Sequence, residues 1–127
     1  MAVQTFKDLH VFNIAFDLAM SIYEYSQAWP KEERYSMTDQ IRRSSRSVCA
    51  NISEAWRKRR YMRHFISELS DADAEAAETR VWLQFAQRCG YLYSSQYDSL
   101  DANYNRINGG LVNMMNQPEK WCGPSRL

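Results

Sequence analysis

Most of the helix-breaking residues of this chain lie between or after long stretches with a helical pattern of apolar residues. Four Gly and three Pro are present in 127 residues. Pro30 follows the first stretch, Gly90 the third and Pro118 the fourth, and Gly or Pro at such a place marks a turn. We therefore predict helices over residues 5–29, 37–57, 61–89 and 95–117. Short connections favour antiparallel neighbours, so the predicted fold class is all-α, an antiparallel up-down-up-down four-helix bundle.

The length of the chain predicts a single domain. We expect a bundle domain over residues 1–118 and a loosely ordered C-terminal tail over residues 119–127. No apolar run approaches the ~18–20 residues that a membrane span needs, and the N-terminus lacks a signal-peptide pattern. Three cysteines without a CxxC pair are typical of a reducing compartment. We expect a cytoplasmic protein with no membrane partner.

The first predicted helix has a wider apolar surface than a monomeric bundle usually needs. One apolar stripe comprises Leu9, Phe12, Phe16, Ala19 and Tyr23. A second comprises Val11, Ala15, Leu18, Ile22, Tyr25 and Trp29. Two interpretations remain open: the helix is deeply buried within one bundle, or one stripe packs against another subunit.

Positive charge is concentrated between residues 42 and 63. Eight of the sixteen Lys and Arg residues lie there with one acid, Glu54, although the formal net charge of the chain is only +1. Such groups hold phosphates without reading bases. The candidate nucleic-acid-binding residues are Arg42, Arg46, Arg57, Lys58, Arg59, Arg60 and Arg63. The alternative is that this charge serves self-assembly or an acidic protein partner.

A polar stripe borders the apolar face of the second predicted helix. At 100° per residue its members fall within about 80° of one another; they are Gln40, Arg43, Ser47, Asn51 and Glu54. Arg42, Arg46 and Arg57 point elsewhere, and we expect them to face solvent. Because an unsatisfied buried polar group costs about 1–3 kcal/mol, we interpret the stripe as a hydrogen-bonded network that fixes helix register. A ligand or nucleic-acid site is the alternative.

The third predicted helix turns acidic after a basic start. Between His64 and Thr79 it has no Lys or Arg, and its acids are Glu68, Asp71, Asp73, Glu75 and Glu78. In a closed ring these acids would face the basic cluster of a neighbour; otherwise both charged runs are solvated.

In the fourth helix, Gly109-Gly110 lowers helical stability by ~1 kcal/mol per residue. Close approach of another helix, or a local break, would explain this pair.

The residue patterns of common catalytic and metal sites are missing from the sequence. His10 and His64 are the two histidines, too few for a multi-His metal site, and no Cys–His spacing resembles a zinc motif. There is no phosphate-binding Gly-rich loop and no GxSxG turn. We predict no cofactor, no metal and no enzymatic activity.

Several motifs together resemble one bacterial family. FKDLHVF is followed by a WP turn, by Tyr35 with QIRRSSRSVCANISEA, and by AQRCGYL. This order is similar to the bacterial four-helix-bundle proteins, also called 23S rRNA intervening-sequence proteins, over about residues 6–115. The central motif, Q-x-R-R-x-x-x-S-x-x-x-N-I-x-E, is met by Gln40, Arg42, Arg43, Ser47, Asn51, Ile52 and Glu54. Glu78 matches the family's acidic position, whereas Ser53-Glu54-Ala55 replaces the usual Ala-Glu-Gly.

The resemblance implies a left-handed four-helix bundle that assembles as a cyclic homopentamer. A more distant similarity is to the accessory protein of diversity-generating retroelements, a pentameric bundle that partners a reverse transcriptase and nucleic acid. We therefore expect a non-enzymatic, homo-oligomeric protein that binds RNA or DNA non-specifically through a basic rim. The alternative is a protein-interaction scaffold.

Overall fold

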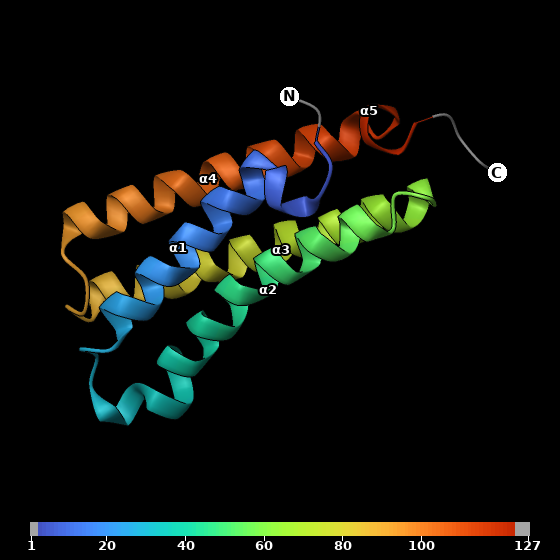
Figure 1. Cartoon of the computed structure of the whole chain (residues 1–127). Helices are drawn as coiled ribbons and strands as arrows, with labels where there is room; N and C mark the ends of the chain where they lie inside the picture. The colour runs from blue at the N-terminus through green and yellow to red at the C-terminus, as the bar shows by residue number, and fades with distance from the viewer. Residues whose placement is uncertain (1–2, 124–127) are drawn as a thin grey trace.

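The computed structural model describes residues 3–123, which fold into a bundle of long helices (Figure 1). The long helices are α1 (His10–Ser26), α2 (Asp39–Arg57), α3 (Met62–Arg88) and α4 (Ser94–Asn116). The short helical segments are η1 (Phe6–Asp8), η2 (Lys31–Glu33), η3 (Arg34–Thr38) and α5 (Glu119–Cys122). No strand occurs between residues 3 and 123. The predicted all-α four-helix bundle is confirmed.

The first helix is shorter at both ends than predicted. Thr5 starts the separate segment η1: its Oγ1 accepts a hydrogen bond from the Lys7 amide at 3.1 Å, and the Asp8 carboxylate accepts one from the Thr5 amide at 3.2 Å. Leu9 is extended, with φ −74° and ψ 127°, so α1 begins only at His10. The prediction of one helix over 5–29 was wrong because this local capping closes the first turn early.

The entry to α2 is also irregular. Ser36 has non-helical backbone angles, φ −127° and ψ −105°, and α2 begins at Asp39. The Ser36 hydroxyl donates to Glu33 Oε1 at 2.8 Å, and the Tyr91 hydroxyl donates to Glu33 Oε2 at 2.9 Å. These bonds lower the pKa of Glu33 and connect the segment before α2 to the turn between α3 and α4.

The core lies between the four long helices, and α3 packs against both α2 and α4. Small side chains let α2 and α3 approach closely, since Ala55, Ala72 and Ala76 are fully buried. Two buried hydroxyls also meet there: Ser44 Oγ and Thr79 Oγ1 are hydrogen-bonded at 2.8 Å. The largest buried apolar side chains are Tyr104, Phe65, Ile22, Ile41, Ile52, Leu69, Leu83, Ile107 and Leu111.

The glycine pair of the fourth helix marks neither a break in the helix nor a close approach of another helix within residues 3–123. Helix α4 continues through Gly109 and Gly110 to Asn116 without a break. A Cβ atom added at either glycine would meet nothing within 4 Å among residues 3–123. Gly110 instead lines an open groove of about 480 Å³ between α1 and α4.

The C-terminal segment is more ordered than predicted. Residues 119–122 form α5, and the rings of Trp121 and Trp56 lie 6.5 Å apart at 73°, an edge-to-face contact. The prediction of a loosely ordered tail was wrong for these residues, because Trp121 has an apolar surface to bury on the end of α2. Residues 124–127 lie outside the described part of the chain, and the boundary at residue 118 stays a prediction.

No helix between residues 3 and 123 combines the length and the apolar composition that crossing a bilayer requires.

Candidate nucleic-acid interface

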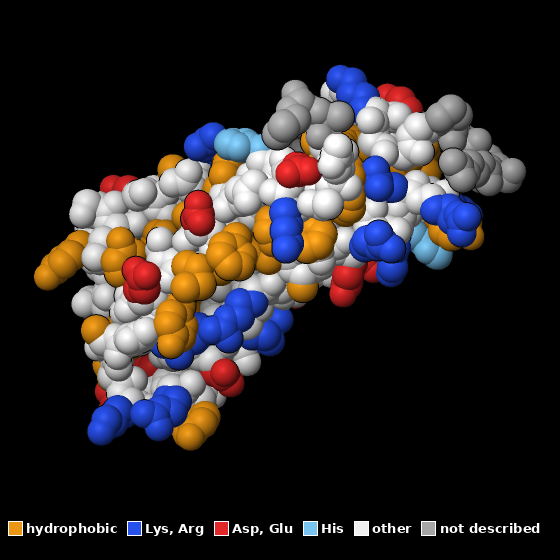
Figure 2. All heavy atoms as spheres, viewed as in Figure 1, with side chains coloured by type: hydrophobic (Ala, Val, Ile, Leu, Met, Phe, Trp, Pro, Cys, Tyr) orange, Lys and Arg blue, Asp and Glu red, His pale blue; other side chains and the backbone are white. Residues whose placement is uncertain are grey.

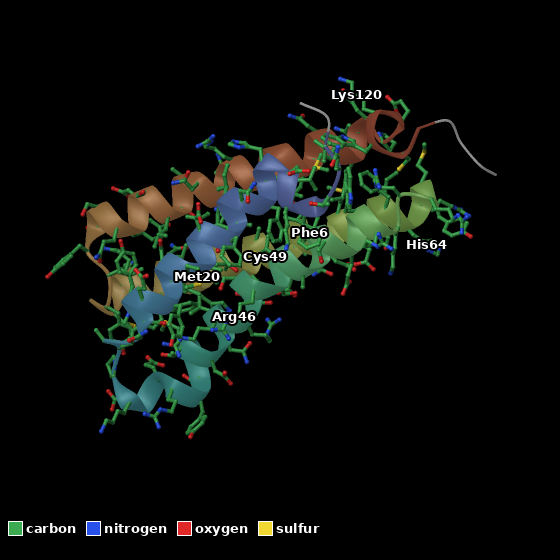
Figure 3. The ribbon with its side chains drawn as sticks, in the orientation of Figure 1. Phe6, Met20, Arg46, Cys49, His64 and Lys120 are labelled. Atoms are coloured by element: carbon green, nitrogen blue, oxygen red, sulfur yellow. The ribbon has the colours of Figure 1, made fainter. Side chains whose placement is uncertain are left out.

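The predicted basic residues occupy two separate places. Arg42 and Arg46 lie in the N-terminal half of α2, beside Tyr23 of α1, and Figure 3 shows Arg46 at this position. The other five lie at the turn between α2 and α3, next to α5 (Figure 1). The structure therefore does not bring all seven residues into one surface.

Arg42 is tied to α1 rather than directed into solvent. Its Nε donates to the hydroxyl of buried Ser26 at 2.8 Å. Its guanidinium carbon lies 4.8 Å from the centroid of the Tyr23 ring, and that of Arg46 lies 5.8 Å from the same centroid. The expectation that Arg42 faces solvent was wrong, because a cation over an aromatic ring and a hydroxyl acceptor hold it against the bundle.

At the turn, two basic residues have partners within the chain. Lys58 Nζ lies 2.6 Å from Glu68 Oε1, and this hydrogen bond raises the pKa of Lys58. The Arg59 guanidinium lies 3.5 Å from the centroid of the Trp56 ring, and its Nε donates to the Trp56 carbonyl at 2.8 Å. These two side chains are positioned by the protein itself.

The other three basic residues of the turn, Arg57, Arg60 and Arg63, are exposed. Among residues 3–123 they form no ion pair and no side-chain hydrogen bond. We call these three residues the turn cluster. Figure 2 shows Lys and Arg side chains gathered at this end of the molecule. Their donors are directed to solvent and are available to an external anion.

Within the polar stripe of α2, Arg43 makes the ion pairs that join α2 to α3. Arg43 forms ion pairs with Glu75, at 3.2 Å, and with Glu78, and its Nε donates to Gln40 Oε1 at 3.3 Å. Glu78 also accepts a hydrogen bond from Trp82 Nε1 at 3.0 Å. The Glu78 carboxylate raises the pKa of Arg43. These contacts join the two helices at one register.

The remaining residues of the stripe lie nearer the C-terminal end of α2. Asn51 Nδ2 donates to Ser47 Oγ at 3.1 Å, which is a bond within α2. Glu54 is exposed and lies beside Glu68 of α3. These three residues therefore add little to the contact that Arg43 makes.

The acids of α3 are mostly occupied inside the chain. Glu68 binds Lys58, and Glu75 and Glu78 bind Arg43. Asp73 Oδ1 accepts a hydrogen bond from Asn108 Nδ2 at 2.6 Å. Opposite charges on α2 and α3 thus meet within one subunit, which leaves fewer free acids for the basic cluster of a neighbour.

The Glu54 carboxyl has a raised pKa because its protonated form donates a hydrogen bond to the Glu68 carboxylate. The hydrogen bond from Lys58 lowers the pKa of Glu68. A raised pKa in the folded state contributes stability below the unfolded pKa, and this contribution is lost as pH rises through the folded value. Glu54→Gln keeps a donor for Glu68 and removes the second negative charge. We expect this variant to be more stable than the parent at neutral pH, by at most about 1 kcal/mol because Glu54 is exposed to solvent.

Thermal melts of both proteins between about pH 4 and pH 7 measure this difference. The stability gain of Glu54→Gln should grow as pH rises through that interval. A gain that shrinks with rising pH, or a variant less stable than the parent at neutral pH, would contradict the proposed repulsion between Glu54 and Glu68.

The described chain leaves part of the apolar surface of α1 uncovered, at Phe16 of the first stripe and at the neighbouring Met20. Ala15, Leu18 and Ile22 of the second stripe are buried in the core. In contrast, Phe16 is 50% exposed and Met20 45% exposed. Figure 2 shows the apolar run along α1, and Figure 3 places Met20 on this helix across from Arg46. A single bundle therefore does not bury all of the apolar surface of α1.

Sequence reasoning missed two residues at the turn. Trp121 and Cys122 of α5 line a pocket of about 230 Å³ together with Arg59 and Arg60. Trp121 lies beside the basic turn in space but far from it in the sequence, so no spacing pattern connected the two. No group of three His, Cys, Asp or Glu side chains that would hold a metal ion occurs in the part of the chain that the structure describes.

Comparisons with known proteins decide the family. Residues 7–113 match the family described as 23S rRNA-intervening sequence protein. The chain belongs to this family. A solved structure from Bacteroides thetaiotaomicron VPI-5482, described as a protein with unknown function from the S23 ribosomal protein family, is 30% identical. The similarity covers 84% of this chain and 96% of that chain, with a TM-score of 0.76. No curated protein sequence matches the chain.

Membership in the 23S rRNA-intervening sequence protein family agrees with the resemblance inferred from the sequence motif. Arg43, a motif residue, forms an ion pair with Glu78, the residue at the family's acidic position. The pairing gives these two positions a structural role in joining α2 to α3.

Proposed function

We propose that this protein binds RNA or DNA through the turn cluster, without sequence preference and without catalysing a reaction. The observation that carries the proposal is that Arg57, Arg60 and Arg63 are exposed and have no acidic partner among residues 3–123. Elsewhere in the same region the chain does neutralise its cations: Lys58 binds Glu68, and Arg43 binds two acids. Three guanidinium groups at one turn, without an acidic partner in the described part of the chain, attract phosphates and make no choice among bases.

The site proposed here is narrower than the set of seven residues predicted from the sequence. Arg42 and Arg46 are directed onto Tyr23, away from the turn. Lys58 and Arg59 are held by partners and would assist through their charge and position. The cytoplasm, with its reduced thiols and abundant nucleic acid, is the setting that fits the three free cysteines.

A direct binding measurement tests the proposal. Fluorescence anisotropy would follow labelled RNA and DNA oligonucleotides of unrelated sequence as protein is added at ~50 mM salt, where phosphate contacts are strong. We expect binding to every oligonucleotide, with similar affinities. Absence of binding at this salt concentration would contradict the proposal, and a strong preference for one sequence would contradict its sequence tolerance.

A second proposal concerns self-association, and the uncovered stripe of α1 supports it. Phe16, Met20 and Tyr23 form an apolar surface that is 37–50% exposed in the single chain. Arg42 and Arg46 border this surface. We propose that it packs against another copy in a homo-oligomer, and the family resemblance makes a cyclic pentamer the expected form. In such a ring, each subunit would add one turn cluster to the rim.

Light scattering on a sizing column at micromolar concentration measures the assembly. We expect a mass several times that of the 15.0 kDa chain. Phe16→Glu should shift the mass toward the monomer, because a charge at a packed apolar contact must lose its water. A parent protein that elutes at 15.0 kDa would contradict self-association and leave the stripe simply exposed.

A further inference from the structure

The pocket at the α2–α3 turn has features that the exposed arginines alone do not explain. Its lining residues come from two places in the sequence, Arg59 and Arg60 from the turn and Trp121 and Cys122 from α5. Its volume is about 230 Å³. Since one water molecule takes about 30 Å³ of liquid, the pocket holds a group several times larger than water.

Arg59 is fixed at the wall of this pocket without a counter-ion. Its guanidinium stacks on Trp56 at 3.5 Å from the ring centroid, and its Nε donates to the Trp56 carbonyl. Its two terminal nitrogens form no hydrogen bond or ion pair with residues 3–123. Burial lowers the pKa of Arg59; the neighbouring Cys122 opposes this shift and the charge of Arg57 adds to it. A positioned, half-buried cation with free donors is suited to an anionic oxygen.

Trp121 supplies an aromatic surface next to that cation. The indole is half-buried and meets the Trp56 ring edge to face at 6.5 Å, so the two flat surfaces are not stacked on each other. An aromatic side chain beside an arginine is the usual arrangement for holding a base and its phosphate in proteins that bind single strands. Neither the sequence motif nor the turn cluster predicts this second feature.

We infer that the pocket accepts one unstacked nucleotide, with a phosphate oxygen on Arg59 and the base against Trp121. This inference rests on the proposed nucleic-acid binding and adds a preference between single-stranded and duplex nucleic acid. In a duplex the bases are paired and stacked, and reaching the pocket would require breaking those contacts. The protein therefore prefers single strands to duplexes of the same sequence.

The first test compares one oligonucleotide of about 15 nucleotides, alone and annealed to its complement, in anisotropy titrations. The single strand should bind more tightly. Trp121→Ala should weaken single-strand binding about tenfold, the effect of losing one stacked base, and leave duplex binding unchanged. Trp121→Phe keeps an aromatic ring and should retain most of the single-strand affinity.

The outcomes separate this inference from the proposed function. Equal affinity for the single strand and the duplex, or equal losses on both in Trp121→Ala, would overturn the pocket inference and leave the turn cluster as a phosphate site. Absence of binding to either form would overturn the proposed function itself. Circular dichroism of both Trp121 variants should give the helical content of the parent, so that any change in affinity reflects binding and not loss of folding.

Alkylation of cysteines in the unsubstituted protein gives an independent measurement of where the nucleic acid binds. Cys122 lines the pocket, whereas Cys89 is exposed at the far end of α3 and is the internal control. Both thiols would be alkylated with iodoacetamide and measured by mass spectrometry, at mildly alkaline pH because burial raises the pKa of Cys122. The single strand at about ten times its Kd should slow alkylation of Cys122 about tenfold and leave Cys89 unaffected. An unchanged rate at Cys122 would overturn the inference.

Discussion

Replacing Arg57, Arg60 and Arg63 together by Gln is expected to weaken binding of a short RNA about 100-fold at ~0.1 M salt. The estimate follows from three lost phosphate contacts, each of which contributes a slope of about −0.7 in the logarithm of affinity against the logarithm of salt for single strands. The three side chains are exposed and have no partner between residues 3 and 123, so their loss removes no contact of the fold. Helical content and melting temperature should therefore stay unchanged.

A matched variant controls for net charge. Lys31, Arg34 and Arg88 are also exposed, and they lie at the opposite end of the bundle, near the turn between α3 and α4. Their replacement by Gln removes the same number of positive charges, and we expect nearly parental affinity. An equal loss in this control would mean that total charge, not the turn cluster, attracts the nucleic acid. Loss of the oligomer in the turn variant would instead favour the scaffold function.

Tyr104→Phe is expected to stabilise the protein by about 1–3 kcal/mol. Tyr104 is fully buried in α4, and its hydroxyl has no hydrogen-bond partner among residues 3–123. Burial raises the pKa of this hydroxyl. A buried donor without a partner has lost its bonds to water and gained none in the fold. Phenylalanine keeps the ring and removes the unsatisfied group.

Differential scanning calorimetry would measure the change, and about 3–5 °C in melting temperature is expected for each kcal/mol in a domain of this size. Tyr35→Phe is the control, because Tyr35 is 84% exposed and its hydroxyl stays in water in both states. A Tyr104→Phe variant that melts below the parent would mean that the hydroxyl does bond in solution.

The helices themselves were predictable because their apolar residues repeat at the helical period and because Gly or Pro follows three of the four. The ends of α1 were not, since the Thr5 and Asp8 bonds that close η1 form within three residues and leave the apolar pattern unchanged. Order in α5 was missed for a related reason. It depends on contact between Trp121 and Trp56, which are distant in the sequence.

The sequence predicted which residues are basic at the candidate site, but not which of them have partners within the fold. The run of Lys and Arg is visible in the sequence, yet pairing of Lys58 with Glu68 depends on how α2 and α3 align after the turn. Arg42 was expected in solvent because its helix face is polar, and the position of Tyr23 on α1 was needed to show otherwise. The sequence alone therefore could not tell the three free arginines from the four engaged residues.

The salt dependence of RNA binding shows directly whether the turn cluster holds phosphates. Anisotropy titrations of the parent and of the Arg57, Arg60 and Arg63 variant would be repeated across a series of salt concentrations. We predict that the affinity of the parent falls with salt and that the variant loses about two units of the slope, the share of three phosphate contacts. Equal slopes in the two proteins, or an affinity of the parent that does not change with salt, would contradict it.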